Sequence, residues 1–262
     1  MRITVLLLAA ACCLTGCQSS TSEEPAGPGI QWMGKNEAAN EAAAAGIRHF
    51  VNVEVDKAFT MFEHAVNLDS SLFAPHTMLA LMADGEKREY HQKMAAQFVA
   101  DKNEVSKMFV SLIDAPRDSI GARQNREVWA KMHEAAPDGL FIHYMYARTR
   151  TLRNDTVARM AALDDLIVAA EKSSRGRSIL AGALNLKGYM LQITGDLEGG
   201  TAAIERYLKE YPEGYNPLDS RAEFYLFAGD TANAIVWYKK VLERYPFSNS
   251  AIQALRELEP QD

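Results

Sequence analysis

The sequence predicts an all-α protein made of stacked antiparallel helix pairs, and three observations carry this prediction. After Gly34, apolar residues recur at intervals of three and four, which puts them on one face of a helix. No long stretch alternates apolar and polar residues, as a half-buried strand would. Two adjacent segments near the carboxyl end repeat with one fixed period, which is typical of a fold assembled from stacked structural units.

The chain begins with an apolar segment of the kind that directs export. After the positive start at Arg2, residues 3–13 are apolar, and the four residues that end at Cys17 read Leu-Thr-Gly-Cys. The run is too short to span a bilayer, which takes about 20 apolar residues. Its end resembles the lipobox of bacterial lipoproteins, which implies removal of residues 1–16 as a signal peptide and acylation of Cys17. A plain secretory signal that ends near a cysteine is the alternative.

A lipid-anchored amino terminus predicts a location in the bacterial cell envelope. Several acyl chains make a durable anchor, because each buried CH₂ group contributes about 0.8 kcal/mol. In lipoproteins of two-membrane bacteria, an Asp after the cysteine is a signal for retention in the inner membrane, and this chain has Gln18 there. The resemblance therefore favours the outer membrane and leaves open whether the protein faces the periplasm or the surface.

Residues 17–35 form the expected flexible tether between the anchor and a helical domain that covers residues 36–262. The stretch is rich in Ser, Thr, Glu, Pro and Gly and has little to bury before Ile30 and Trp32. A flexible chain of this length reaches roughly 20 to 25 Å, so the folded domain stays close to the membrane. We expect Trp32 and Met33 to pack on the first helices, with membrane contact as the alternative.

The repeat near the carboxyl end defines the helix pairs. Residues 181–214 align with residues 215–248 at a shift of 34 residues and without a gap. The identical positions mark the turn between the two helices of a pair and the end of the second helix, where Gly stops one helix and Asp caps the next. They are Leu184 with Leu218, Gly195 with Gly229, Asp196 with Asp230, Leu208 with Leu242, Tyr211 with Tyr245 and Pro212 with Pro246.

A third copy of the repeat lies near residues 39–72. Its Gly46 and Ala58 take slots that hold small residues in the other two copies, and Phe62 takes a bulky slot. Small residues are expected where two helices approach closely, with bulky residues filling the space beside them. Asp56 is placed to cap the second helix of this copy.

These repeats resemble the tetratricopeptide repeat over residues 36–258. The resemblance implies a right-handed α-solenoid of about six helix pairs with a capping helix at the carboxyl end. Residues 80–105 match the repeat least and are expected to hold the longest helix. The expected pairs span residues 36–68, 73–101, 103–136, 138–172, 177–211 and 217–245, and the capping helix spans residues 248–258.

Composition and motifs argue against several classes of function. Asp and Glu outnumber Lys and Arg by 34 to 28, which disfavours a nucleic-acid binder. All three cysteines lie within the first 17 residues, so the helical domain has no thiol for a disulfide, a metal site or a nucleophile. Phosphate-loop and serine-hydrolase motifs are missing. His133-Glu134 begins like a zinc-protease motif, but Pro137 stands where the second histidine belongs.

The other titratable residues are expected to have structural roles. The carboxylate pairs Glu127/Glu134 and Asp164/Asp165 are expected to be solvated, because acid-base work needs a pocket that separates two pKa values. We therefore expect no enzyme, no metal and no cofactor. Four arginines are interpreted as covering apolar neighbours, with an acidic peptide or an anionic head group as the alternative ligand. They are Arg148, Arg150, Arg153 and Arg159.

The inner face of the solenoid is the predicted binding site. In the tetratricopeptide family, this face of the first helices forms a groove for extended or helical peptides. The matching slots here combine aromatic, amide and charged side chains, which suit a peptide-reading surface. In the first repeat the same slots hold Ala43, Ile47 and Phe50. The tether is a candidate cover for this end of the groove. The family's carboxylate clamp is not reproduced. The predicted groove residues are Tyr144, Arg148, Asn185, Tyr189, Gln192, Asp219 and Glu223.

The function predicted from the sequence is that of a non-catalytic interaction scaffold. The lipid on Cys17 holds the chain at the membrane, and the groove binds a protein or peptide partner in the envelope. The alternative is a lipoprotein that binds a small ligand or a glycan, with exposed Trp and Tyr side chains stacking on the sugar.

Overall fold

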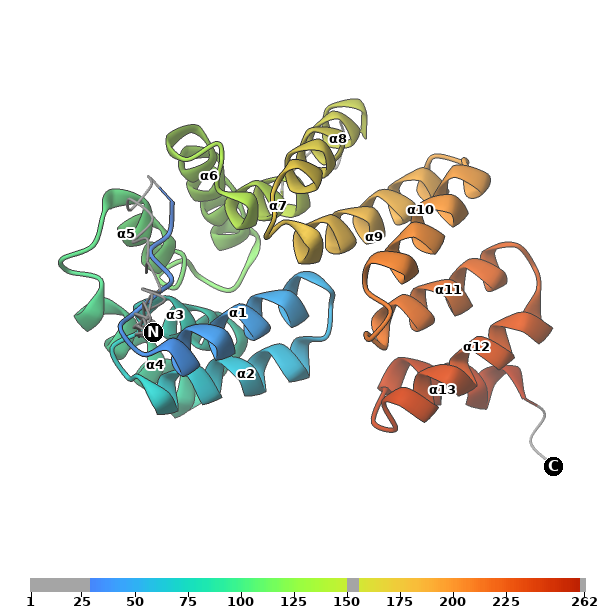
Figure 1. The fold of residues 1–262 in the computed structure, drawn as a ribbon, viewed down its shortest axis with the longest axis horizontal. Helices are drawn as coiled ribbons and strands as arrows, with labels where there is room; N and C mark the ends of the chain where they lie inside the picture. Colours follow the sequence, from blue (N-terminus) through green and yellow to red (C-terminus); the bar gives the residue numbers. More distant parts are fainter. Residues whose placement is uncertain (1–28, 150–155, 260–262) are drawn as a thin grey trace, which may run out of the picture.

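The chain is an all-α protein, as the sequence predicts. The computed structural model describes residues 29–149 and 156–259. Within these two ranges it contains helices α1 to α13 and no strand (Figure 1). No helix in these ranges has both the length and the apolar character needed to cross a bilayer. The predicted signal peptide and the lipid site at Cys17 lie outside the described residues.

The helices form six consecutive pairs and a closing helix, which confirms the predicted pairing. Short connections separate the two helices of each pair, and the two helices pack against each other. The bounds are α1 Glu37–Val51, α2 Val55–Leu68, α3 Phe73–Met82, α4 Gly85–Phe98, α5 Glu104–Ser111, α6 Ser119–Ala135, α7 Leu140–Thr149, α8 Thr156–Lys172, α9 Arg177–Ile193, α10 Leu197–Glu210, α11 Asn216–Phe227, α12 Thr231–Arg244 and α13 Asn249–Leu258.

The repeated turn has the predicted chemistry in both copies. Gly195 and Gly229 have φ of +91° and +76°, a backbone region that favours glycine. The side chain of Asp196 then accepts a hydrogen bond from the Gly199 N–H, and Asp230 accepts one from the Asn233 N–H. Each pair therefore ends its first helix and starts its second through the same two residue types.

Two details differ from the sequence prediction. Asp56 lies in the first turn of α2 instead of capping it, because the helix begins at Val55. Residues 80–105 do not hold the longest helix, since α3 ends at Met82 and the chain turns through Gly85, whose φ is +56°. Helix α4 then has 14 residues, against 17 in α6, α8 and α9.

Small and bulky residues alternate at the helix contacts as expected. A methyl group at Gly46 would overlap the ring of Phe62, and one at Gly188 would overlap the side chain of Ile204. Ala58 is fully buried. The helices of a pair therefore approach closely at glycine and alanine and are spaced by bulky residues beside them.

The last residues of the predicted tether are packed against the helices. Ile30 and Trp32 are half-buried against the core, and the Trp32 ring centroid lies 5.4 Å from that of Phe109 and 5.2 Å from that of Phe141. Met33 is 56% exposed. The prediction of packing is confirmed for Trp32 and wrong for Met33, and residues 29–32 are part of the folded body because they bury aromatic surface.

The solenoid closes on itself, which the sequence did not predict. In most solenoids each repeat contacts only its neighbours. Here α1 also contacts α9, four repeats further along the chain, and one core of buried residues runs from Val51 to Phe224. Figure 1 shows the connection between α1 and α2 pointing at α9 and at the start of α11. We call the contact of the first repeat with α9 and with the residues around the start of α11 the closure.

Candidate functional site

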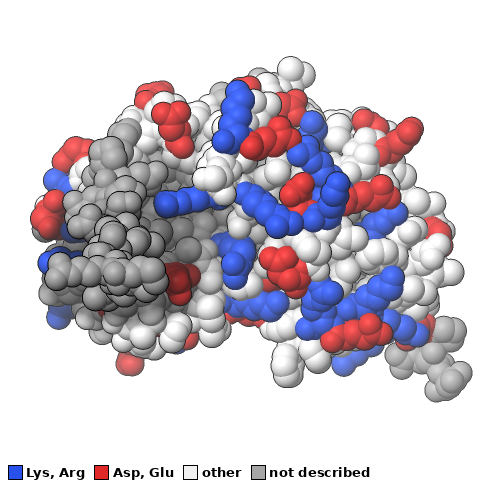
Figure 2. Space-filling model, viewed as in Figure 1, with Lys and Arg blue, Asp and Glu red and all other residues white. Residues whose placement is uncertain are grey.

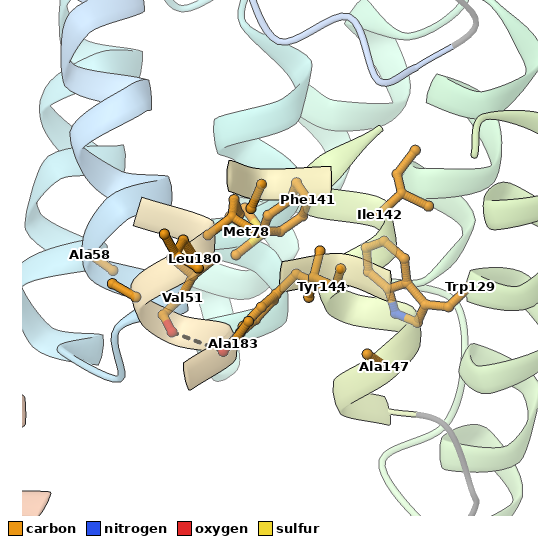
Figure 3. Packing of buried hydrophobic residues seen from close by; sticks show 14 of the residues in the cluster. Val51, Ala58, Met78, Trp129, Phe141, Ile142, Tyr144, Ala147, Leu180 and Ala183 are labelled. Atoms are coloured by element: carbon orange, nitrogen blue, oxygen red, sulfur yellow. Dashed lines mark hydrogen bonds between the residues drawn. The ribbon is translucent and has the colours of Figure 1, made fainter. Parts of the chain in front are cut away.

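The connection between α1 and α2 occupies part of the predicted groove. The Tyr144 side chain on α7 is completely buried, and its hydroxyl donates a hydrogen bond to the Val51 carbonyl oxygen at 2.8 Å (Figure 3). A methyl group at Gly182 on α9 would overlap the same carbonyl oxygen. Asn52 donates to the Ser178 carbonyl oxygen at 3.3 Å. Tyr144 therefore binds the chain's own first repeat, and its prediction as a partner contact is wrong for this structure.

Two other predicted groove residues are also turned inward. Asn185 is 5% exposed and its side-chain oxygen accepts a hydrogen bond from Ser220 at 3.0 Å. Asp219 is 7% exposed and accepts a hydrogen bond from Ser250 at 2.7 Å. Each of these polar groups is thus satisfied within the protein. Both predictions are corrected for this structure, because burial leaves little surface for a partner to contact.

Four predicted groove residues remain half-buried. The Tyr189 hydroxyl on α9 donates a hydrogen bond to the carboxylate of Glu223 on α11. The Arg148 guanidinium lies over the Phe50 ring, 5.3 Å from its centroid. Gln192 lies near the end of α9. The structure therefore brings Tyr189 and Glu223 together and places Arg148 in a separate cavity, so the seven residues do not form one continuous groove.

Glu54 is the centre of the closure. Its side chain is 0% exposed, and its carboxylate accepts hydrogen bonds from the Tyr215 backbone N–H at 2.7 Å and the Tyr211 hydroxyl at 3.0 Å. His49 Nδ1 lies 2.8 Å from it and the Lys57 ammonium 3.4 Å. Burial alone would raise the pKa of Glu54, but the His49 hydrogen bond, the Lys57 charge and the two tyrosine contacts together lower it. The carboxylate is therefore ionised at neutral pH.

The backbone around Glu54 is held from several helices. Tyr207 is fully buried, and its hydroxyl donates to the Asn52 carbonyl oxygen at 3.2 Å. The Tyr215 hydroxyl donates to the Asp56 carboxylate at 3.0 Å. Between these contacts Val53 has a φ of 63°, a conformation that costs a β-branched residue about 1–3 kcal/mol. The hydrogen bonds of the closure offset this strain.

An open cleft of about 590 Å³ lies beside the closure, between the first repeat and the last. We call it the end cleft. Val53 and Val55 form its side toward the first repeat, and Phe247 lies on the opposite side, in the connection between α12 and α13. These side chains are 38%, 48% and 75% exposed. Exposed apolar residues gathered around a cleft are typical of a surface that another molecule covers.

Acidic groups complete the end cleft. Asp56 and Asp219 both line it. The Lys57 ammonium lies 4.7 Å from the Tyr215 ring centroid, and Tyr215 stacks on Tyr245 with centroids 4.4 Å apart. The Lys57 ammonium therefore lies close to aromatic rings and to the Glu54 carboxylate, and both attract its positive charge. The cleft therefore combines apolar walls with two carboxylates.

Replacing Asp219 with asparagine is expected to stabilise the protein at pH 7. Burial, with a smaller contribution from Glu223, raises the pKa of Asp219 to about 6 against the opposing hydrogen bond from Ser250. Because this folded-state pKa lies above that of the unfolded chain, the folded state binds the proton more tightly and stability falls as the pH rises from about 4 to 6. Asp219→Asn should raise the free energy of unfolding at pH 7 by on the order of 2 kcal/mol.

Urea unfolding at pH 4.5 and pH 7 measures this effect. The stability difference between Asp219→Asn and the unchanged protein should be small at pH 4.5 and grow toward pH 7. Asp164→Asn is the control, because Asp164 is exposed and pairs with Lys187 at the surface. Equal differences at the two pH values would show that the buried Asp219 carboxyl is not the group that titrates.

The histidines form pairs that the sequence did not predict. Nδ1 of His76 and Nδ1 of His91 lie 2.8 Å apart, and both side chains are buried. The rings of His133 and His143 lie 4.6 Å apart. In the described ranges no group of three or more His, Cys, Asp or Glu side chains could hold a metal ion. Burial and the charge of His91 lower the pKa of His76 to about 4, so this pair is neutral at pH 7.

The basic cluster is only partly described. Arg148 covers Phe50, as the packing interpretation predicts. Burial lowers the pKa of Arg159, and its Nε is buried without a hydrogen bond. Arg150 and Arg153 lie outside the described residues. Figure 2 shows basic and acidic side chains interspersed over one face of the molecule, so this face carries no large field of a single sign.

The residues that organise the site carried no local signal in the sequence. Glu54 lies in a short connection between two helices, where a carboxylate is usually solvated. Its partners Tyr211 and Tyr215 are more than 150 residues away in the chain. The sequence identifies Tyr211 only as a residue at the end of the second helix of the 34-residue repeat. The repeat pattern therefore predicts where Tyr211 lies in its helix pair but not its hydrogen bond to Glu54.

Two solved structures share the fold over most of the described chain. No protein-family profile and no curated protein sequence matches the chain. A chain of the APC/C hetero-tetramer Cut9-Hcn1 aligns with a TM-score of 0.54 and 12% identity, covering 85% of this chain and 43% of that one. Yeast Tom70 aligns with a TM-score of 0.53 and 14% identity, covering 86% of this chain and 55% of its own. This chain thus spans about half the length of either protein.

The geometry and these comparisons define a helical-repeat protein. Twelve of its thirteen described helices pair in sequence order, α13 packs against the last pair, and no strand occurs among the described residues. The matching structures are tetratricopeptide-repeat proteins, and the chain has the tetratricopeptide-repeat fold. At identities of 12% and 14% the likeness concerns the fold alone.

Proposed function

We propose that this protein is a non-catalytic scaffold that binds a protein partner in the bacterial cell envelope, where lipid on Cys17 anchors it to the outer membrane. The end cleft carries the proposal for partner binding. The export signal and the Leu-Thr-Gly-Cys ending support the anchor. The Cut9-Hcn1 chain belongs to a hetero-tetramer, so the same fold supports protein contacts there. Because a fold does not define a function, the end cleft is the observation that supports partner binding.

The end cleft suits a partner segment that carries apolar residues and a positive charge. Phe247, Val53 and Val55 offer apolar area at the rim, and such side chains dominate binding energy once a partner covers them. Asp56, which is exposed, offers a carboxylate that would pair with Lys or Arg of the partner. A partner in this cleft touches the first and the last repeat together and would stabilise the closed form.

In-cell crosslinking with mass spectrometry tests this proposal through one matched pair of variants. Phe247→Ser should lower partner recovery by about tenfold or more, because Phe247 is the most exposed apolar side chain that lines the cleft. Ile193→Ser is the control, since Ile193 is 72% exposed and lies at the end of α9, outside the lining of the cleft. Full recovery with Phe247→Ser would exclude the end cleft as the binding surface.

The anchor is tested in the same experiment with Cys17→Ala. This variant should leave the membrane fraction, because it lacks the predicted acylation site. Loss of membrane association together with loss of partner recovery would place the partner at the membrane. Retention of Cys17→Ala in the membrane fraction would contradict the lipid anchor.

A further inference from the structure

A second cavity, of about 460 Å³, lies among helices from the first four repeats. Phe50 of α1, Met78 of α3, Trp129 of α6 and Met145 of α7 line it, and Met78 and Trp129 are 2% and 3% exposed. Phe50 and Met145 are half-buried, so they present an apolar surface to the cavity that can adapt to a ligand. The volume and the apolar lining match those of small-molecule sites.

Two arginines give this cavity a positive charge. Arg126 of α6 and Arg148 of α7 line it, and no acidic residue does. Neither guanidinium forms an ion pair with a carboxylate in the part of the chain that the structure describes. In a chain with a formal charge of −6, a cavity with two cations and no carboxylate is complementary to an anion. We call it the arginine cavity.

One polar atom of the arginine cavity lacks a partner. The side-chain oxygen of Asn125 on α6 is buried and accepts no hydrogen bond. Buried polar atoms are satisfied in most proteins, and an acceptor without a protein partner beside a cavity is explained by a bound water or by a ligand that donates to it. The cavity therefore offers an apolar surface, two cations and one free acceptor.

The geometry points to a binding site for a small N-acylated amino acid with an apolar side chain. Its carboxylate lies between Arg126 and Arg148, and its side chain packs against Phe50 and Met145. Its amide N–H donates to the Asn125 side-chain oxygen. The carboxylate, the apolar side chain and the amide N–H of this ligand each match one feature of the cavity. The arginine cavity adjoins the end cleft at Met82, which lines both, but neither arginine belongs to the end cleft and the site does not depend on the proposed protein partner.

Isothermal titration of the purified chain with three related compounds tests the assignment. N-acetylphenylalanine should bind. N-acetylphenylalaninamide, which lacks the carboxylate, should bind at least tenfold more weakly, because charge-assisted hydrogen bonds to the arginines are lost. 3-Phenylpropanoate keeps the ring and the carboxylate but lacks the N–H, and its affinity should be several-fold lower. Equal affinity for the acid and the amide, or no binding of the acid at millimolar concentration, would overturn the proposal.

Matched variants locate the binding. Arg126→Gln and Arg148→Gln should each weaken binding of N-acetylphenylalanine by about tenfold. Arg123→Gln should leave the affinity unchanged, because Arg123 is an exposed residue of the same helix and does not line the cavity. Far-ultraviolet circular dichroism checks that each variant is folded. Binding that survives both cavity variants would overturn the assignment, as would tighter binding of a hexapeptide that ends in phenylalanine, which would assign the cavity to a peptide terminus instead.

Discussion

Replacing Glu54 with alanine should lower the free energy of unfolding by about 3–5 kcal/mol, the effect expected when one partner of a buried charged network is removed. The carboxylate is 0% exposed and holds together groups of the first and the fifth repeat. Without it, the Tyr215 N–H loses its acceptor, and Tyr211 and His49 lose a partner inside the protein. Unsatisfied buried donors add to the loss of the contacts themselves.

Urea denaturation followed by circular dichroism gives the change in unfolding free energy. Glu63→Ala is the matched control, because Glu63 forms a surface ion pair with Lys87 and such pairs contribute about 0–1 kcal/mol. Limited proteolysis should also cut the connection between α1 and α2 faster in Glu54→Ala, since the closure protects it. A loss of stability no larger than that of Glu63→Ala would show that the closure does not hold the fold.

The pH dependence of the closure has the opposite sign to that of Asp219. The folded-state pKa of Glu54 is lowered, so its contribution is present at neutral pH and is lost as the pH falls through that pKa. Asp219 destabilises the fold as the pH rises toward 6. The contribution of Glu54 to stability therefore falls in acid, whereas protonation of Asp219 in acid removes its destabilising charge.

Replacing Trp32 with alanine should destabilise the protein by about 3 kcal/mol, toward the lower end for removal of a large aromatic core residue because Trp32 is only half-buried. The indole packs against three rings, those of Phe62, Phe109 and Phe141. These rings belong to α2, α5 and α7, so Trp32 joins three repeats that are not all neighbours in the chain. Its removal leaves a gap that the fixed helices cannot fill.

Thermal and urea unfolding of Trp32→Ala and Met33→Ala provide the comparison. The two residues are adjacent, yet Met33 is 56% exposed and its replacement should change stability by less than about 0.5 kcal/mol. Similar small effects for both variants would mean that the segment before α1 rests on the helices without contributing to the fold. Similar large effects would point to a change in the backbone of the segment instead of the loss of the indole.

Much of the helical architecture was predictable because its signals are local. The turn at Gly195-Asp196 and its copy at Gly229-Asp230 depend on backbone conformation and capping within a few residues. The contact of Gly46 with Phe62 lies within one helix pair. A pattern repeated in the sequence reports such interactions directly, so the helix pairs and the capping helix could be placed from it.

The candidate site was predictable only in part, because the groove prediction assumed that repeats touch only their neighbours. Tyr189 and Glu223 do face each other on α9 and α11, as stacked repeats require. Tyr144, Asn185 and Asp219 belong to the same predicted surface but are buried. Whether a residue on the inner face meets solvent or the chain itself depends on the curvature of the whole solenoid.

The sequence by itself determined the helices, their pairing and the segment at the amino terminus that predicts export. The tertiary structure alone decided that the first repeat returns to the fifth, that Glu54 is buried, and where the end cleft and the arginine cavity lie. The physical reason is that small rotations between successive repeats add up over the solenoid. Their sum brings Glu54 to Tyr215, 161 residues away, and no pattern within one repeat encodes that distance.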